Sequence, residues 1–309
     1  MLVELIPRSD AALKLVAFPW AGGTAHSYLS WREHFPPEQP IELLAIALPG
    51  RGARSAEPAQ TDLDTLCDEI VQALLPHLSV PIAFFGHSFG CILATEVARR
   101  LEQHGHPAPV ALLLSAHPAP GTELPAKQLA LSKLPSDSDL LDGLRQWDFA
   151  DDALFSADAD PSLASLVLNS IRADLTLRET YCAAAARSAA PAPLSSSIHV
   201  LVGAEDTSLD HASLAKWSAL TCEKEAFSIS TFPGGHFYLT AGAATQLLET
   251  VCRTAMHGLH RRPPSAFAAE SQAVPDVFIH ERVGHSPLPP PPPPPPLLPS
   301  LHPLPRTPP

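Results

Sequence analysis

The sequence predicts an α/β fold, in which helices cover both faces of a mostly parallel central sheet. Short runs rich in leucine and β-branched residues alternate with longer stretches of helical period, and this alternation is the pattern of successive βαβ units. The rhythm breaks at residues 118–162, which are rich in Pro, Ser and Asp. Because long connections are uncommon unless they are functional, we expect these residues to form an inserted helical lid.

The expected elements follow in chain order. Six apolar runs have the length and composition of strands: Leu13–Phe18, Ile41–Leu48, Ile82–Phe85, Val110–Ser115, Ile198–Val202 and Phe227–Phe232. Four stretches between them have helical period and a capping residue near the start: Asp62–Leu75 with Thr61, Phe89–Glu102 with Ser88, His211–Leu220 with Asp210, and Ala241–His257 with Thr240.

Composition and charge narrow the class of partner. The 309 residues are 45% hydrophobic, which is enough for a sizeable core, and their formal net charge is −12. Nucleic acids and anionic membranes need a concentrated positive field, so we expect neither as a partner. A small or carrier-bound substrate fits this charge better.

The cysteines and the apolar runs indicate the cellular compartment of the protein. The five cysteines are scattered with no Cys-x-x-Cys pair, which indicates a reducing compartment and neither a disulfide framework nor a zinc site. Pro7 and Arg8 interrupt the first apolar run, so no secretory signal is evident. The longest apolar runs fall far below the roughly 20 residues of a membrane span. We therefore expect a cytoplasmic protein, and we take a monomer as its assembly state.

The composition changes near residue 261 and reaches eight consecutive prolines at Pro289–Pro296. Proline fixes φ and lacks an amide donor, so residues 261–309 are expected to form an extended, disordered tail that packs no core. Residues 1–260 then form the folded domain. The tail either stays solvated without a dedicated partner, which is the simpler alternative, or docks on an SH3 or WW-type module.

A G-x-S-x-G motif is centred on Ser88. The pentapeptide Gly86–Gly90 directly follows the apolar strand Ile82–Phe85 and precedes a helix. This setting resembles the nucleophile elbow of α/β-hydrolases, where two glycines allow a tight turn that lifts the serine hydroxyl above the sheet. The alternative without catalysis is a glycine turn in which Ser88 only caps the following helix. We expect the neighbouring His87 to point away from the hydroxyl and to pack.

Serine chemistry needs two further side chains. A hydroxyl is a weak nucleophile unless a base takes its proton, and that base needs an orienting carboxylate. His236 is the candidate base because it lies in a glycine-rich loop between a strand and the last helix. Asp206, after the strand Ile198–Val202, is the preferred acid, with Glu205 and Asp210 as alternatives.

An oxyanion needs backbone amides aimed at it. One is expected from Phe89, immediately after Ser88, and the second from the loop after the first predicted strand. In that loop we choose Ala21, with Trp20 as its competitor. Residues 49–52, Pro-Gly-Arg-Gly, resemble a nucleotide loop only weakly, because the third glycine and a following helix are missing.

Taken together, five co-linear segments resemble the type II thioesterases: residues 18–23, 48–52, 84–90, 171–175 and 233–239. That family includes stand-alone editing enzymes of nonribosomal-peptide and polyketide synthases and the medium-chain thioesterase of animal fatty acid synthase. The resemblance covers roughly residues 13–257. It implies an α/β-hydrolase fold, Ser88 as nucleophile with Asp206 and His236, oxyanion amides from Ala21 and Phe89, and no cofactor.

The resemblance also implies a substrate and leaves alternatives. The family hydrolyses acyl groups from the phosphopantetheine arm of an acyl-carrier protein or from coenzyme A. The family often has Met where Phe89 stands, which affects the shape of the acyl pocket and leaves the amide in place. Arg172 and Asp174 are expected to fix a helix to the core by ion pairing. An oxyester hydrolase, an acyltransferase, or an idle scaffold that presents the proline-rich tail are the alternatives.

Overall fold

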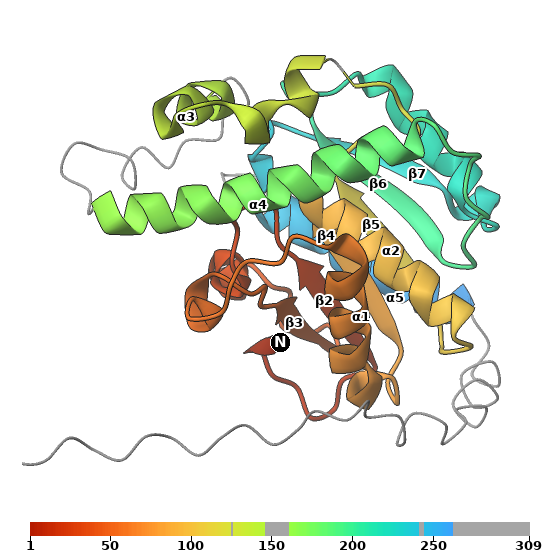
Figure 1. Cartoon of the computed structure of the whole chain (residues 1–309). Helices are drawn as coiled ribbons and strands as arrows, with labels where there is room; N and C mark the ends of the chain where they lie inside the picture. The colour runs from red at the N-terminus through yellow and green to blue at the C-terminus, as the bar shows by residue number, and fades with distance from the viewer. Residues whose placement is uncertain (125, 146–160, 241–243, 262–309) are drawn as a thin grey trace, which may run out of the picture. The chain divides into compact units, whose positions relative to one another are not determined.

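The computed structural model describes residues 1–124, 126–145, 161–240 and 244–261 (Figure 1). The middle of the expected lid, at residues 146–160, lies outside the described residues, as do residues 241–243. The proline-rich tail from residue 262 onwards also lies outside them.

A seven-stranded sheet forms the centre of the fold, in the order β1-β3-β2-β4-β5-β6-β7. β1 runs antiparallel to β3, and every other neighbouring pair is parallel, which confirms the predicted fold class. The strands are β1 (Leu2–Ile6), β2 (Leu13–Phe18), β3 (Ile41–Ile46), β4 (Ile82–His87), β5 (Ala111–Ser115), β6 (Ser197–Gly203) and β7 (Ser228–Phe232). The sequence analysis missed β1, an edge strand whose short run is interrupted by Glu4.

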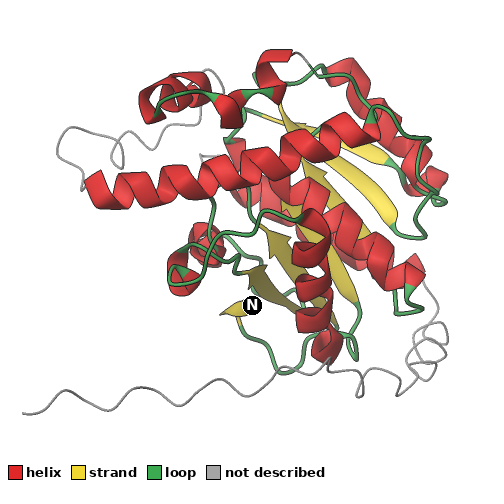
Figure 2. Ribbon diagram, in the orientation of Figure 1, coloured by secondary structure: helices red, strands yellow, loops and turns green. Residues whose placement is uncertain are grey.

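Helices lie on both faces of the sheet (Figure 2), and a hydrophobic layer lies between the sheet and the helices on each face. Because side chains alternate along a strand, Val16 and Phe18 of β2 enter one layer, while Leu15 and Ala17 enter the other. The first layer contains α1 (Leu63–Leu74), α2 (Phe89–Gln103) and the 3₁₀ helix η6 (His211–Leu220). The second contains the 3₁₀ helix η1 (Ala25–Glu33) and α5 (Ala244–Arg261).

The helix starts differ in detail from those predicted. Asp62, rather than Thr61, caps α1, since its carboxylate accepts the amide of Asp64 at 3.0 Å. Asp210 caps η6 as expected, although this helix is 3₁₀ and not α. Ser88 lies at the N-cap position of α2 but makes no side-chain capping hydrogen bond, so its hydroxyl does not cap the helix. Thr240 adjoins residues outside the description.

The described part of the expected lid is helical. It contains two short 3₁₀ helices, η4 (Ala126–Leu129) and η5 (Leu131–Lys133), and α3 (Asp137–Arg145). The sequence analysis did not draw the long helix α4 (Pro161–Ala185), which lies beside the ends of the central strands in Figure 1. A third apolar cluster joins these elements: Leu131, Leu140, Leu144, Leu168, Ile171 and Leu175. Four further 3₁₀ turns complete the described chain: η2 (Gly52–Arg54), η3 (Leu75–His77), η7 (Lys224–Ala226) and η8 (Tyr238–Thr240).

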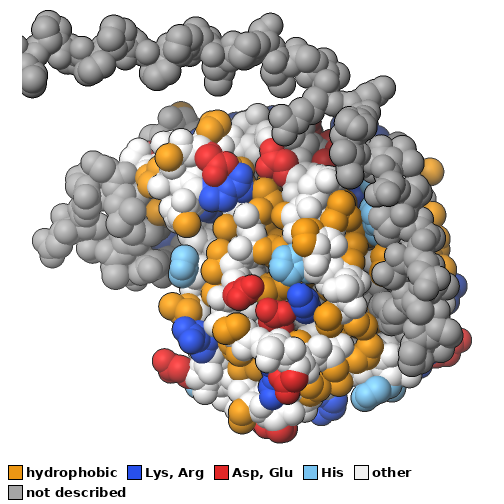
Figure 3. Space-filling view, turned by 90° about the horizontal axis from the view of Figure 1, so that it is seen from below, with side chains coloured by type: hydrophobic (Ala, Val, Ile, Leu, Met, Phe, Trp, Pro, Cys, Tyr) orange, Lys and Arg blue, Asp and Glu red, His pale blue; other side chains and the backbone are white. Residues whose placement is uncertain are grey.

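In the described ranges no helix combines the length and the apolar character that crossing a membrane demands. On the face drawn in Figure 3, acidic and basic side chains are interspersed among apolar ones.

Candidate active site

Ser88 stands on a strained turn between β4 and α2. Its φ is 51° and its ψ is −117°, a conformation that a residue with a Cβ rarely adopts. A Cβ at Gly86 would collide with the backbone of Gly90, and a Cβ at Gly90 would collide with the backbone carbonyl of Phe18. Both glycines are therefore needed for the strand and the helix to meet at this angle.

The backbone of Ser88 is fixed to the neighbouring strand. Its amide donates to the carbonyl of Ser115 at 2.8 Å, and its own carbonyl accepts the amide of Cys91 at 2.9 Å. Ser115 ends β5, so Ser88 lies at the carboxyl edge of the parallel strands, where α/β sheets usually bind ligands. The rigid turn holds the hydroxyl at that edge.

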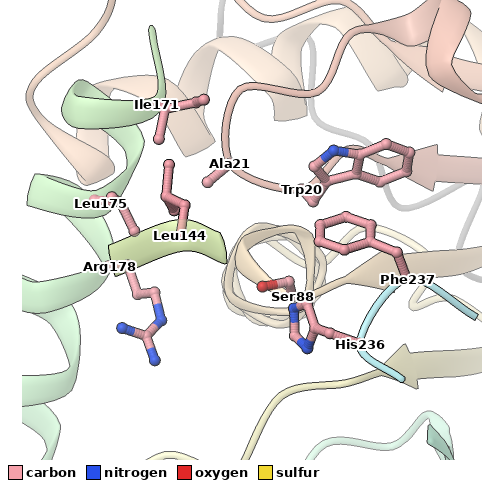
Figure 4. Close-up of a pocket in the computed structure, with 9 residues that line it drawn as sticks. All are labelled: Trp20, Ala21, Ser88, Leu144, Ile171, Leu175, Arg178, His236 and Phe237. Carbon is pink, nitrogen blue, oxygen red and sulfur yellow. The ribbon is translucent and has the colours of Figure 1, made fainter. Parts of the chain in front are cut away.

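His236 and Asp206 meet at the ends of β7 and β6. Nδ1 of His236 lies 2.8 Å from Oδ2 of Asp206, and both side chains are buried. A side chain at Gly203 would collide with the carbonyls of Gly234 and Gly235, so this glycine lets the two loops approach. Ser88 and His236 lie side by side in Figure 4.

The electrostatics of Asp206 favour its ionised form. Burial by itself raises the pKa of this carboxyl, but hydrogen bonds from His236 and from the amide and hydroxyl of Ser208 outweigh burial and hold the pKa below its usual value. An ionised carboxylate only accepts hydrogen bonds, so Nδ1 of His236 carries the proton. Nε2 of the neutral ring then keeps its lone pair and can act as a base.

The three candidate acids have three different partners. The carboxylate of Asp206 contacts His236. The carboxylate of Glu205 accepts the amide of Gly234, and that of Asp210 accepts the amide of Ala212 at 3.1 Å. Glu205 thus holds the histidine loop and Asp210 starts a helix, while Asp206 is placed to orient the imidazole.

His87 supports the site from beneath. It is fully buried, and burial lowers the pKa of its imidazole well below the usual value. Its Nδ1 lies 2.9 Å from Oγ of Ser115, which in turn lies 2.7 Å from the hydroxyl of Tyr238. The ring packs against His236 with 5.1 Å between ring centroids. His87 therefore packs, as the sequence analysis expects.

The loop after β2 offers a limited choice of oxyanion donors. The amide of Gly22 donates to Oδ2 of Asp174 at 2.8 Å, and that of Gly23 donates to the carbonyl of Trp20 at 2.9 Å. Trp20 and Ala21, the two residues weighed from sequence, remain as this loop's candidates. Phe89 is the first residue of α2, so its amide belongs to the helix start, where amides have no intrahelical acceptor.

A buried ion pair between Arg51 and Asp174 was missed from sequence. The guanidinium contacts both carboxylate oxygens, at 2.7 Å for Nη2 and Oδ1, and both side chains are at most 6% exposed. Asp174 also accepts the amide of Gly22, so it links α4 to the oxyanion loop. Arg172 also forms an ion pair, with Asp137 of α3 at 3.1 Å, and it donates to the carbonyls of Ser132 and Leu134, so it fixes α4 to the lid region and not to the core.

Ser88 opens into a cavity that we call the apolar cavity (Figure 4). Apart from Ser88, His236 and Arg178, its lining is apolar: Trp20, Ala21, Leu144, Ile171, Leu175 and Phe237. Three of the apolar residues come from α3 and α4, so the lid region supplies much of the wall. The lining is that of a site for a small apolar group.

The comparison with protein families gives a single description. The model of the thioesterase domain matches residues 13–255. This chain belongs to the thioesterase family. The match spans strands β2 to β7 together with Ser88, Asp206 and His236, and it confirms the resemblance found from sequence.

Individual relatives of this thioesterase agree with the family. It is 30% identical to the gramicidin S biosynthesis protein GrsT of Aneurinibacillus migulanus, over 79% of this chain and 90% of the relative. It is 31% identical to the human medium-chain S-acyl fatty acid synthase thioesterase, over 79% of this chain and 88% of the relative. The solved type II thioesterase BorB from the borrelidin biosynthetic cluster superposes with a TM-score of 0.69 at 32% identity, covering 82% of this chain and 97% of that one. The protein is thus a thioesterase of the α/β-hydrolase fold.

Proposed function

We propose that Ser88, His236 and Asp206 hydrolyse acyl thioesters through an acyl-serine intermediate. The observation that carries this proposal is the hydrogen bond of 2.8 Å between Nδ1 of His236 and Oδ2 of Asp206. His236 lines the same cavity as Ser88, which is held on a strained turn. Nε2 of His236 takes the hydroxyl proton as Oγ of Ser88 attacks the thioester carbonyl. The amides of Phe89 and Ala21, with Trp20 as the alternative, hold the oxyanion.

The second half of the reaction uses the same groups. The carbon–sulfur bond breaks as the oxyanion collapses, and His236 returns the proton to the departing sulfur. Water then attacks the acyl-serine, with His236 as base, and releases the free acid and Ser88. The depressed pKa of Asp206 supports this cycle, because an anion stabilises the imidazolium that forms twice.

We further propose an acyl group on the phosphopantetheine arm of a carrier protein, or on coenzyme A, as the substrate. The apolar cavity suits an acyl chain, and the relatives are named for gramicidin S biosynthesis, fatty acid synthesis and the borrelidin cluster. The role is release or editing of chains on a synthase. A reducing, cytoplasmic location is supported by five free cysteines, and we propose that the enzyme acts as a monomer.

The domain boundaries form part of the proposal. Activity belongs to residues 1–260, with a lid at about residues 118–162. Residues 261–309 would then serve location or partner choice, including an SH3 or WW-type partner for the proline run at Pro289–Pro296.

The test is capture of the intermediate. Purified enzyme is mixed with an acyl-CoA, quenched in acid and digested. The mass of the peptide that contains Ser88 is then measured by mass spectrometry to detect the added acyl group. We expect acylation of Ser88 and release of free thiol in the wild type, and neither in Ser88→Ala. Ser218→Ala, at a half-buried serine that lines neither cavity, is the control and keeps both. Faster turnover of the matching oxyester would favour the esterase alternative, and an unlabelled Ser88 would favour the idle scaffold.

A further inference from the structure

A second cavity shares Ser88, His236 and Arg178 with the apolar cavity. We call it the polar cavity because its own lining includes His117, Gln128 and Ser208. The rest of its lining is Ala116, Pro118 and Leu209, so two spaces that differ in their polar side chains meet at the nucleophile. A thioester also has two halves on either side of its carbonyl, and an amide-bearing half needs polar contacts.

His117 brings an unusual acceptor to the polar cavity. Its side chain is buried, and its Nδ1 lies 2.8 Å from the carbonyl of Pro118. A carbonyl only accepts, so Nδ1 donates and carries the proton of the neutral ring. Nε2 then holds a lone pair, and no protein group in the described part of the chain hydrogen-bonds to it. Buried polar atoms without a partner are rare, and they call for an explanation.

The surroundings keep this ring neutral. Burial, and next the nearby charge of Arg178, lower the pKa of His117 to about 3. The guanidinium is itself buried and donates to the carbonyl of Gln128 at 2.9 Å. His117 therefore stays a hydrogen-bond acceptor at Nε2 throughout the physiological pH range.

The position of His117 is fixed by its backbone. Its carbonyl accepts Nε1–H of Trp217 at 2.9 Å. The preceding Ala116 has a positive φ of 54°, and its amide donates to the carbonyl of Leu201 at 2.9 Å. Strain of this kind persists where the surrounding structure holds it. The ring is thus held in place before a ligand arrives, which lowers the entropy lost on binding. Because Nε2 is buried from solvent in this structure, a ligand reaches it only when the cavity widens to admit the thiol half.

We propose that Nε2 of His117 accepts the amide N–H that lies next to the sulfur in the thiol half of the substrate. In pantetheine, two methylene groups separate the sulfur from the first amide nitrogen, so this N–H must lie near Ser88 when the thioester carbonyl is attacked. The acyl chain then occupies the apolar cavity and the pantetheine amide the polar cavity. This inference rests on the proposed function and names the residue that recognises the thiol side.

The first test changes the substrate and leaves the enzyme intact. One acyl group is presented as the thioester of N-acetylcysteamine and as the thioester of 2-mercaptoethyl acetate, in which an ester oxygen replaces the N–H. We expect kcat/KM to be about fivefold to tenfold higher for the amide, the effect of one buried hydrogen bond. Equal rates overturn the inference and leave the proposed function standing. If neither thioester is hydrolysed, the proposed function fails and the inference fails with it.

The second test changes the residue. Asn at position 117 can still donate to the carbonyl of Pro118, but it is too short to place an acceptor where Nε2 lies. We therefore expect His117→Asn to lose the preference for the amide, measured as the ratio of kcat/KM on the two thioesters. Gln at this position reaches further and should restore part of the preference. A His117→Asn variant that retains the full preference overturns the inference.

His199 offers a matched control. It is also buried, its Nδ1 lies 2.8 Å from Oγ of Ser228, and its Nε2 likewise has no partner among the described groups. Burial lowers its pKa to about 4. It lies in β6 and lines neither the apolar nor the polar cavity. His199→Asn should keep the preference for the amide unchanged, and loss of the preference in both variants overturns the assignment to His117.

Discussion

The two walls of the apolar cavity are built differently. On the sheet side, Ser88 and His236 stand on short turns at the strand ends, and backbone hydrogen bonds and glycine contacts fix both turns. On the lid side, Leu144 and Leu175 are held mainly by apolar contacts within their cluster. Directional bonds fix positions more tightly than apolar packing, which tolerates substitution. The comparison indicates that the sheet sets the chemistry and the lid region sets which acyl group fits.

On the sheet side of the cavity, the substitution with the largest expected effect on activity is Asp206→Asn. The amide can present its NH₂ group to Nδ1 and so stabilise the wrong imidazole tautomer, a change that costs about 10⁴-fold in kcat in a well-studied triad. We expect a loss of this order in thioester hydrolysis, with an unchanged melting temperature at neutral pH to within a few degrees.

Glu205→Gln and Asp210→Asn are the controls for this assignment. Their carboxylates contact backbone amides, of Gly234 and Ala212 respectively, so we expect at most a tenfold loss of kcat in either variant. Near-normal turnover in Asp206→Asn together with a severe loss in one control would show that the acid is assigned to the wrong residue.

The joint between the two walls is Asp174. Asp174→Ala removes the partner of the buried Arg51 and the acceptor of the Gly22 amide. We expect the free energy of unfolding to fall by about 3–5 kcal/mol, the usual effect of leaving a buried charge without its partner. We also expect kcat to fall by about 10²-fold, since the loop that carries an oxyanion donor loses its anchor.

A double variant separates these two effects. Arg51→Met combined with Asp174→Leu removes both charges, so the free energy of unfolding should recover most of the loss. The Gly22 amide still lacks its acceptor, and kcat should stay low. Urea denaturation and steady-state kinetics on the same preparations measure both quantities. Full recovery of kcat in the double variant would show that Asp174 acts on stability alone.

These contacts also mark what sequence reasoning can reach. Ser88 and His236 lie in short glycine motifs next to apolar strands, so a few neighbouring residues are enough to predict both as site residues. Asp174 and Arg51 are 123 positions apart, and nothing local at either residue indicates the other. The pairing depends on how α4 packs across the sheet edge, which only the three-dimensional structure provides.

The same reasoning explains the misplaced elements. A lid at residues 118–162 was predicted from the break in βα rhythm, yet α4 was not drawn, although Ile171, Asp174 and Leu175 all lie on it. It is apolar on more than one side, because it contacts the lid cluster through Leu175 and the core through Leu177. A helix that is buried on several sides lacks the single apolar stripe by which a surface helix is recognised in a sequence.

Acyl selectivity tests the lid side directly. Leu144 of α3 is buried and lines the apolar cavity, so Leu144→Ala should enlarge the cavity. We expect the ratio of kcat/KM for a long acyl chain to that for a short one to rise by about tenfold, the worth of one or two methylene groups in an apolar pocket. The rate on the shortest substrate should change little, because the chemistry belongs to the sheet side.

The control for Leu144→Ala is a residue of the same cluster outside the cavity. Leu140→Ala removes the same volume from α3, but Leu140 does not line the apolar cavity. Both variants should lose stability by about 2–5 kcal/mol, and only Leu144→Ala should change the acyl preference. An equal change in both would show that loosening of the lid region, and not cavity volume, controls selectivity.

The smallest effect is expected from removing the tail. Truncation after Arg261, the last residue of α5, removes a segment whose proline-rich composition lacks apolar residues at helix or strand spacing. No proposed catalytic residue lies beyond His236, so both walls of the cavity stay intact. We expect kcat/KM on an acyl-CoA to stay within about twofold of the full-length value, with an unchanged melting temperature. A truncated enzyme that melts normally but loses most of its turnover would show that the tail contributes to the site, and that the catalytic domain extends past residue 260.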